Sequence, residues 1–159
     1  MALHIRVGTP ADEDVAVASN AAMASETEGK TLHEPTLRAG VRAALADSAK
    51  GFYLMAERNG EAVGQLMVTT EWSDWRNGWY WWIQSVYVTP GARRAGVFRA
   101  LFGHLKVKAM ADPTVIGLRL YVEHDNERAK AVYAAMGMTG EPYHLMGVYP
   151  LPGKESAFR

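Results

Sequence analysis

The spacing of apolar and polar positions predicts a chain in which strands and helices alternate. Six segments have the alternating or continuously apolar pattern of β-strands, namely 4–7, 52–57, 62–70, 79–88, 115–123 and 143–149. Between the second and third segments, Asn59-Gly60 suits a two-residue turn, because both residue types tolerate positive φ angles. We therefore expect 52–70 to form a β-hairpin.

Four other segments carry apolar residues three and four positions apart, as amphipathic helices do, namely 10–23, 35–49, 97–111 and 127–136. Thr9 is expected to cap the first of them, with Pro10 at its first position. The polar run 25–30 is expected to end this helix and to form an acidic connector to the next. Gly51 suits a left-handed ending of the second helix, and Gly137 suits the ending of the fourth.

The 79–88 segment also contains part of a cluster of tryptophans, since all five lie between Trp72 and Trp82. A period of two places Trp79 and Trp81 on one face with Ile83, Ser85 and Tyr87, and the intervening residues on the other. One interpretation is a central strand buried on both sides. The other is that Trp72, Trp75 or Trp82 lines the pocket of a substrate that accepts a transferred group, or forms part of a dimer contact. Indole rings suit either role because they combine apolar area with a polar N–H.

Composition describes an ordinary globular chain of one domain, 1–159, whose last ten residues, 150–159, we expect to be a flexible tail. The 17 basic and 17 acidic residues balance, without the basic patch that nucleic-acid binding requires. The chain has no cysteine, which excludes thiolate nucleophiles and Cys-ligated metals. It shows no signal-peptide pattern and no apolar run near the ~20 residues that span a bilayer, so we expect a cytoplasmic protein.

Candidate chemistry begins where the 79–88 strand ends, at Pro90-Gly91 and the loop before the helix at Val97. A helix start presents unpaired N–H groups and a partial positive charge, so it stabilises an anion. Gly96 permits close approach of the backbone, and Arg93 and Arg94 add positive charge. The loop is therefore predicted to hold a diphosphate.

Two blocks of sequence resemble the GNAT superfamily of N-acyltransferases. Arg93-x-x-Gly96-x-Phe98 resembles the family's pyrophosphate loop, with Phe98 at a position where the family usually has Gly or Ala. Asn126-x-x-Ala129-x-x-x-Tyr133-x-x-x-Gly137 resembles its second block, in the expected order along the chain. The order of the predicted elements matches the family over nearly the whole chain.

This resemblance implies a mixed α/β (α+β) fold with a mostly antiparallel sheet of about six to seven strands, a central parallel splayed pair and about four helices. It implies acetyl-CoA as co-substrate, without a metal. It also implies that a primary amine of a small molecule or peptide attacks the thioester of acetyl-CoA directly. The residues that it implies for the cofactor are Val86, Tyr87, Val88, Arg93, Arg94, Ala95, Gly96, Val97, Phe98 and Asn126. An asparagine at position 126 would equally be explained as a plain helix cap without any contact to the cofactor. Tyr133 lies where the family places the general acid.

The general base and the acceptor site are less defined. Many relatives carry a base on the long central strand, but 79–88 contains no acid. Glu26 and Glu28 are the leading candidates for the base, with Glu71, Glu123, His124 and His144 as further candidates. The candidates for binding the acceptor are Trp72, Trp75, Trp82, Gln84 and Glu123.

Two other functions remain open from the sequence. A GNAT-like module could bind an acyl-CoA without catalysis and act in ligand sensing or protein interaction, as Phe98 and the missing strand carboxylate suggest. A different phosphate-binding domain is disfavoured, because neither a Walker loop nor Gly-x-Gly-x-x-Gly occurs. Exposed aromatics or the final strand could support a homodimer.

Overall fold

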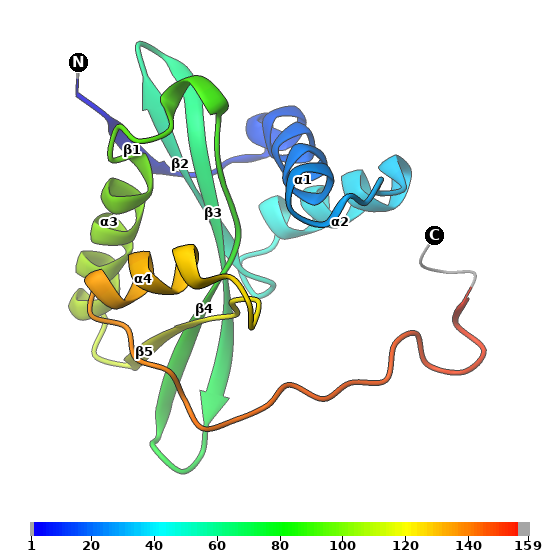
Figure 1. Ribbon diagram of the computed structural model, residues 1–159, viewed down its shortest axis with the longest axis vertical. Coiled ribbons are helices and arrows are strands. Elements are labelled where there is room, and N and C mark those ends of the chain that lie inside the picture. The colour runs from blue at the N-terminus through cyan, green and yellow to red at the C-terminus, as the bar shows by residue number, and fades with distance from the viewer. Residues whose placement is uncertain (1, 156–159) are drawn as a thin grey trace. The chain divides into compact units, whose positions relative to one another are not determined.

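The computed structural model describes residues 2–155, and the chain divides into two compact units, one ending at Leu120 and one beginning at Tyr121. The first unit is built on a single sheet with the strand order β1-β2-β3-β4-β5 (Figure 1). The strands are β1 His4–Val7, β2 Phe52–Arg58, β3 Glu61–Ser73, β4 Gly78–Val88 and β5 Val115–Leu120. Neighbouring strands are antiparallel except β4 and β5, which are parallel.

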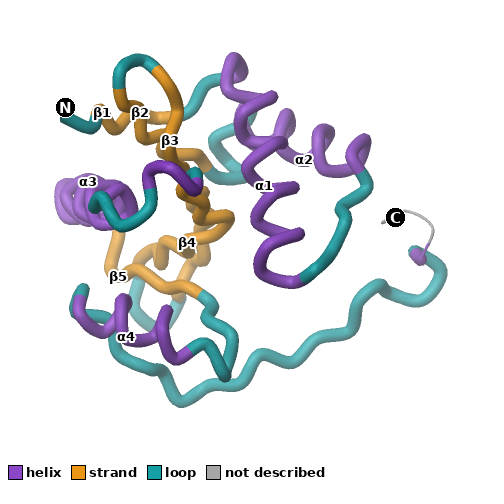
Figure 2. The backbone as a smooth tube through the Cα atoms, turned by 45° about the horizontal axis from the view of Figure 1, so that its top comes forward, coloured by secondary structure: helices purple, strands orange, loops and turns teal. Residues whose placement is uncertain are grey.

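Helices cover both faces of this sheet. In the first unit they are η1 Pro10–Asp12, α1 Glu13–Glu28, α2 Glu34–Ala46, η2 Pro90–Ala92 and α3 Val97–Ala111. Figures 1 and 2 show α1 and α2 on one face and α3 on the other. The second unit contains α4 Glu127–Ala135. The predicted mixed α/β class with one parallel strand pair and four α-helices is thereby confirmed, but the pair β4–β5 lies at one edge of the described sheet and not at its centre.

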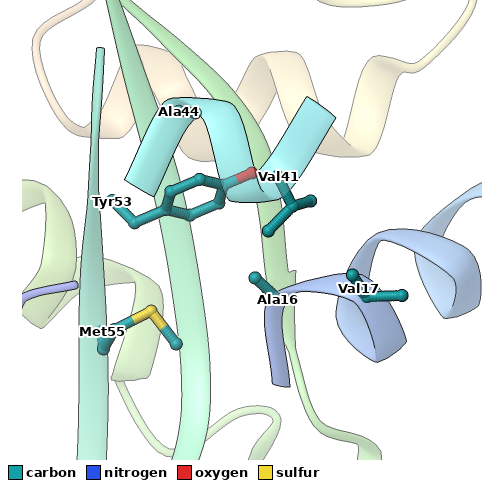
Figure 3. Close-up of a cluster of buried hydrophobic side chains, with 6 residues drawn as sticks. All are labelled: Ala16, Val17, Val41, Ala44, Tyr53 and Met55. Atoms are coloured by element: carbon teal, nitrogen blue, oxygen red, sulfur yellow. The ribbon is translucent and has the colours of Figure 1, made fainter. Parts of the chain in front are cut away.

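Two apolar layers hold the sheet between these helices. On the α1 and α2 face, side chains from α1, α2 and β2 turn toward one another (Figure 3), and they are Ala16, Val17, Val41, Ala44, Tyr53 and Met55. On the α3 face, Val97, Leu101 and Leu105 are buried. Each layer removes apolar surface from water, which is the main favourable term in folding.

The sheet has five strands, so the expected number of six to seven is wrong. Residues 143–149, predicted as a last strand, lack ladder pairing in the part of the chain that the structure describes. An apolar alternating pattern is satisfied as a strand only where a partner strand supplies backbone hydrogen bonds. Of the expected tail 150–159, residues 156–159 lie outside the described residues.

Helix α1 is longer than the sequence pattern predicts. It continues through Glu26 and ends at Glu28, where Gly29 adopts φ 62° and its N–H bonds to the carbonyls of Ala24 and Ser25. The run 25–28 is therefore the last turn of a helix and not a connector. Helix α2 in turn ends at Ala46, so the left-handed ending predicted at Gly51 is also wrong.

The described residues contain no helix that combines the length and the apolar character needed to cross a membrane.

Candidate active site

Strands β4 and β5 part in the middle of β4. Their ladder runs from Trp79–Val115 to Ile83–Leu120 and ends there. Beyond Ile83, β4 continues to Val88 and is paired with β3, through Tyr87–Gln65 and Val88–Gly64. Within residues 2–155, the edge of β4 that faced β5 therefore has no strand partner over the last residues of the strand, among them Val86, Tyr87 and Val88, and the Val88 carbonyl accepts a hydrogen bond from Arg93. Backbone groups on such an edge can pair with an extended ligand.

A β-bulge lies at the point where the strands part. The β3–β4 register shifts between Gln65 and Met67, so that β4 carries one extra residue, and Ser85 has φ 51°. A bulge reverses the alternation of side chains beyond it. Tyr87 consequently lies on the α1 face, where its hydroxyl reaches Glu26. The prediction that Tyr87 shares a face with Trp81 and Ile83 is therefore wrong.

The loop after β4 has the backbone of an anion site. Arg94 has φ 62° and Gly96 has φ 79°, and Gly96 is the N-cap residue of α3. The first turn of α3 contains no acidic residue, and Gly96 has no side chain that could accept hydrogen bonds from the backbone N–H groups of that turn. Those N–H groups and the positive helix end therefore remain suited to a phosphate.

Phe98, the residue that departs from the family pattern, lies in the first turn of α3. Its ring centroid is 6.2 Å from that of Phe102, one turn further along the helix. Val97 beside it is buried, and a Cβ at position 64 would lie 2.7 Å from Val97 Cγ1. Gly64 therefore permits the close approach of α3 to β3. The ring of Phe98 packs along the helix while its backbone N–H stays in the first turn.

Arg93 is directed toward β4 and α1. Its Nε donates to the Val88 carbonyl at 3.0 Å, and its Nη2 donates to Glu26 Oε2 at 2.7 Å. The Tyr87 hydroxyl donates to Glu26 Oε1 at 3.2 Å, and the guanidinium lies 5.5 Å from the Tyr87 ring centroid. Burial, followed by the contact with Glu26, raises the pKa of Tyr87 above its ordinary value. These three side chains link the candidate phosphate loop to the end of α1.

The predicted general acid, Tyr133, and the cofactor candidate Asn126 lie in the second unit. Tyr133 is part of α4, and burial raises the pKa of its phenol, so the phenol keeps its proton at neutral pH. Asn126 caps this helix, because its Oδ1 accepts a hydrogen bond from the Ala129 N–H at 3.0 Å. The interpretation of Asn126 as a helix cap is confirmed, and its role with a cofactor stays a prediction.

The structure brings two of the acceptor candidates to one face of the sheet. Trp82 pairs with Thr69 and Gln84 with Met67, on the face that also carries Tyr87. Gln84 Nε2 donates to Thr69 Oγ1 at 2.6 Å. This places Trp82 and Gln84 on the same side of β4 as the linked side chains of Glu26, Tyr87 and Arg93.

Trp72 and Trp75 do not join them. Trp72 lies 5.0 Å from Trp79 by ring centroids, on the opposite face, and Trp75 is 87% exposed in the turn before β4. Trp72 therefore lies on the other face of the sheet from Trp82, and Trp75 lies between the strands β3 and β4.

The other acidic candidates differ in their surroundings. Glu71 accepts from Trp82 Nε1 at 3.3 Å and from Arg119 Nη1 at 3.2 Å, beside an Arg119 guanidinium stacked 3.6 Å from the Tyr80 ring centroid. Glu28 ends α1 and lies 3.6 Å from Lys30. Glu123, His124 and His144 are exposed residues of the second unit. Within residues 2–155, no three His, Asp or Glu side chains gather as a metal site.

Sequence reasoning missed the residues beneath the bulge. Gln65 is fully buried and donates from Nε2 to the Ser85 carbonyl at 3.1 Å and to Asn20 Oδ1 at 3.2 Å. The detectable signal was a glutamine inside the apolar run 62–68, since buried amides require partners.

Comparison with known proteins identifies the family. The profile of the acetyltransferase (GNAT) family matches residues 18–138. A possible acetyltransferase from Clostridium difficile 630 is 40% identical, with a TM-score of 0.89 over 95% of this chain and 99% of that chain. No curated protein matches the chain in sequence.

More distant solved structures share the fold. A ribosomal-protein-alanine N-acetyltransferase from Brucella melitensis biovar Abortus 2308 is 18% identical, with a TM-score of 0.75 over 92% of this chain and 98% of that chain. An aminoglycoside acetyltransferase from an uncultured soil metagenomic sample is 20% identical, with a TM-score of 0.71 over 93% and 99%. Together with the profile match and the 40% identical structure, the parted parallel strands and the loop before α3 show that this chain belongs to the GNAT acetyltransferase family.

Proposed function

We propose that this protein is an N-acetyltransferase that moves an acetyl group from acetyl-CoA to a primary amine of a small molecule or peptide. The observation that carries this proposal is the open edge of β4 between Ile83 and Val88, which leads directly into a loop of positive φ angles at the start of α3. An extended pantetheine arm and a diphosphate require these two features in this order. Membership of the GNAT family supports the assignment.

The residues of the first unit fit the cofactor in a specific way. Backbone groups of Val86, Tyr87 and Val88 would pair with the pantetheine amides, and the N–H groups of 94–98 would hold the diphosphate. Arg94 is exposed beside these N–H groups and adds positive charge. Arg93 Nε donates a hydrogen bond to the Val88 carbonyl, so the Arg93 guanidinium would approach the cofactor from the α1 side of β4. Acetyl-CoA supplies the acetyl group as a thioester.

The acceptor has to lose a proton before it attacks. An alkyl amine with a pKa near 10 is only about a tenth of a percent neutral at pH 7. Glu26 is the better placed of the two leading candidates, because its carboxylate is hydrogen-bonded to Tyr87 on β4. We assign Glu26 to attract the ammonium group and to receive its proton through water, with Trp82 and Gln84 beside the acceptor.

Tyr133 would complete the reaction as general acid. Collapse of the tetrahedral intermediate would break the carbon–sulfur bond and release a coenzyme A thiolate, which would take the phenolic proton. The proton that the attacking nitrogen loses as the amide forms would then restore the phenol. The raised pKa of Tyr133 supports this role, because the phenol is protonated whenever an amine acceptor is in use. Binding both reactants in line supplies the remaining acceleration by proximity.

The direct test is the release of coenzyme A thiol from acetyl-CoA in the presence of an amine panel, with the acetylated product identified by mass spectrometry. The chain has no cysteine, so the protein itself contributes no thiol to the assay. Two proteins with the same fold are named as a ribosomal-protein-alanine N-acetyltransferase and an aminoglycoside acetyltransferase. The panel should therefore contain peptides with a free N-terminus and sugars with several amino groups. Amine-dependent thiol release with an N-acetylated product is expected.

A second function is favoured by one contact. In the Arg93–Glu26 pair, at 2.7 Å, the loop arginine and the leading base candidate neutralise each other. A non-catalytic module that binds an acyl-CoA for sensing or protein interaction would retain such a pair. Thermal stabilisation by acetyl-CoA without thiol release from any amine of the panel would support this alternative over catalysis.

A further inference from the structure

A chain of buried amide groups connects α1 to the bulge in β4. The Gln65 side chain has no exposed surface, and its Nε2 donates to the Ser85 carbonyl at 3.1 Å and to Asn20 Oδ1 at 3.2 Å. Asn20, on α1 and 6% exposed, donates in turn from Nδ2 to the Tyr53 hydroxyl at 3.4 Å. The network therefore joins α1, β2 and β3 to one carbonyl of β4.

The carbonyl at the end of this network belongs to the residue that makes the bulge. Ser85 has φ 51°, a left-handed conformation that residues with a Cβ adopt only at a cost. The extra residue of a bulge also loses its regular ladder partner. The Gln65 amide supplies a hydrogen bond at that point, and only the amide nitrogen can donate to a carbonyl, which fixes the orientation of the side chain.

This orientation leaves Gln65 Oε1 buried without a hydrogen-bond partner among residues 2–155. A buried acceptor without a partner is unfavourable, and such exceptions are found at sites that serve function more than stability. A hydrophobic residue would fill the same space between α1 and β3 without this penalty. The retained amide is thus best explained by its bond to Ser85.

We propose that Gln65, oriented by Asn20, is a positioning residue that holds the bulge at Ser85 and thereby sets the open edge of β4 for coenzyme A. The inference rests on the proposed function, because the edge in question is the one assigned to the pantetheine arm. Without the amide, the strand can relax toward the regular register, in which Ser85 leaves its left-handed conformation. Val86 and Tyr87 would then present their backbone groups and side chains in the wrong directions.

The test combines Gln65→Met with Ser85→Gly. Methionine keeps the volume of glutamine and removes the donor, so we expect coenzyme A to bind Gln65→Met about tenfold more weakly by titration calorimetry. Glycine adopts positive φ readily, so Ser85→Gly should restore most of the affinity in the Gln65→Met background. In the wild-type background, Ser85→Gly should change the affinity less than about twofold.

A matched control is Thr69→Val, which removes a hydrogen bond on the same face of the same strand pair, outside the bulge. This variant should bind coenzyme A as the wild type does. Melting temperatures of all variants establish that each one is folded, and the double-mutant comparison gives the coupling between positions 65 and 85.

The outcomes separate the inference from the proposed function. Wild-type affinity in Gln65→Met, or weakened affinity that Ser85→Gly does not rescue, would overturn the inference and leave the proposed function standing. Failure of the wild type to bind coenzyme A would overturn both. A loss in melting temperature alone, without loss of affinity, would assign Gln65 to packing and not to positioning.

Discussion

At the scale of single residues, burial and hydrogen bonding prepare the candidate side chains for different tasks. Tyr133 is a phenol whose raised pKa keeps it a proton donor. The Glu26 carboxylate accepts hydrogen bonds from Tyr87 and Arg93, and so has a fixed position. Transfer of an acetyl group from a thioester to an amine needs a proton acceptor on the amine side and a proton donor on the thiol side. The two residues are suited to opposite ends of that reaction.

The role assigned to Tyr133 predicts the effect of Tyr133→Phe. Phenylalanine keeps the ring and removes the acidic proton, so kcat should fall by roughly ten to a thousandfold, as expected for loss of a general acid. The affinity for coenzyme A should change less than about twofold, because the phenol acts on the sulfur only as the bond breaks. Steady-state kinetics and calorimetry measure the two quantities, and unchanged kcat with a verified acceptor would remove Tyr133 from the mechanism.

At the scale of elements, the ending of α1 determines where Glu26 lies. Gly29 holds the left-handed conformation that terminates the helix, with open space around its Cβ position. Gly29→Ala should therefore destabilise the protein by about 1 kcal/mol through backbone strain alone. Gly40→Ala is the matched control, since Gly40 also has open space but lies inside α2. This second change should stabilise by about 0.5–1 kcal/mol.

Chemical denaturation of both alanine variants distinguishes strain from a general effect of added side chains. Opposite signs for positions 29 and 40 are the expected result. The same sign at both positions would mean that the left-handed turn at Gly29 does not define the end of α1.

The elements that sequence predicts well are those specified by nearby residues. The turn at Asn59-Gly60 and the helix from Val97 to Ala111 occur as predicted, because turn chemistry and apolar spacing are local properties. The bulge at Ser85 was missed because it exists only in the pairing of β4 with β3. That one extra residue moved Tyr87 to the other face and brought it to Glu26, which no pattern within β4 could indicate.

The limits of the prediction at 25–30 and 143–149 have a similar cause. Polar residues such as Thr27 and Glu28 are compatible with a last helical turn, and Thr27 Oγ1 indeed donates to the Met23 carbonyl. The strand pattern at 143–149 depends on a partner strand that the sequence pattern does not supply. Resemblance to the GNAT family indicated the candidate phosphate loop and the candidate general acid Tyr133, but not the Gln65 network beneath the strand.

At the scale of the whole molecule, a charge cluster near the start of the chain ties β1 to η1 and β2. Arg6 binds Asp12 through two bonds of 2.8 Å and also contacts Glu57. The Arg6 guanidinium holds the pKa of the buried Asp12 carboxyl below its ordinary value, despite the opposing effect of burial. The folded protein therefore binds this proton less readily than the unfolded chain does.

This difference predicts how stability depends on pH. The contribution of Asp12 is fully present above the pKa of about 4 that an unfolded aspartate has, and it is lost as pH falls through the lower pKa of the folded state. Asp12→Asn should lower the free energy of unfolding by about 2 kcal/mol at pH 7. The difference between variant and wild type should shrink toward pH 2. Urea denaturation across this range is the measurement, and a constant difference would refute the linkage.

Binding of coenzyme A to the candidate cofactor site is tested by the melting temperature in the presence of about 1 mM coenzyme A, acetyl-CoA or ATP, measured for the wild type and for Gly96→Glu. A ligand that binds only the folded state raises the melting temperature. We predict a rise of roughly 5 °C with both coenzyme A species and none with ATP. Gly96→Glu should lose the rise, because glutamate adds strain at φ 79° and negative charge at the phosphate loop.

The matched control is Gly103→Glu, which places the same charge on an open position of the same helix, beyond its first turn. This variant should keep the rise seen in the wild type. A wild-type melting temperature that coenzyme A and acetyl-CoA leave unchanged, or a full shift in Gly96→Glu, would contradict a coenzyme A site at the loop before α3.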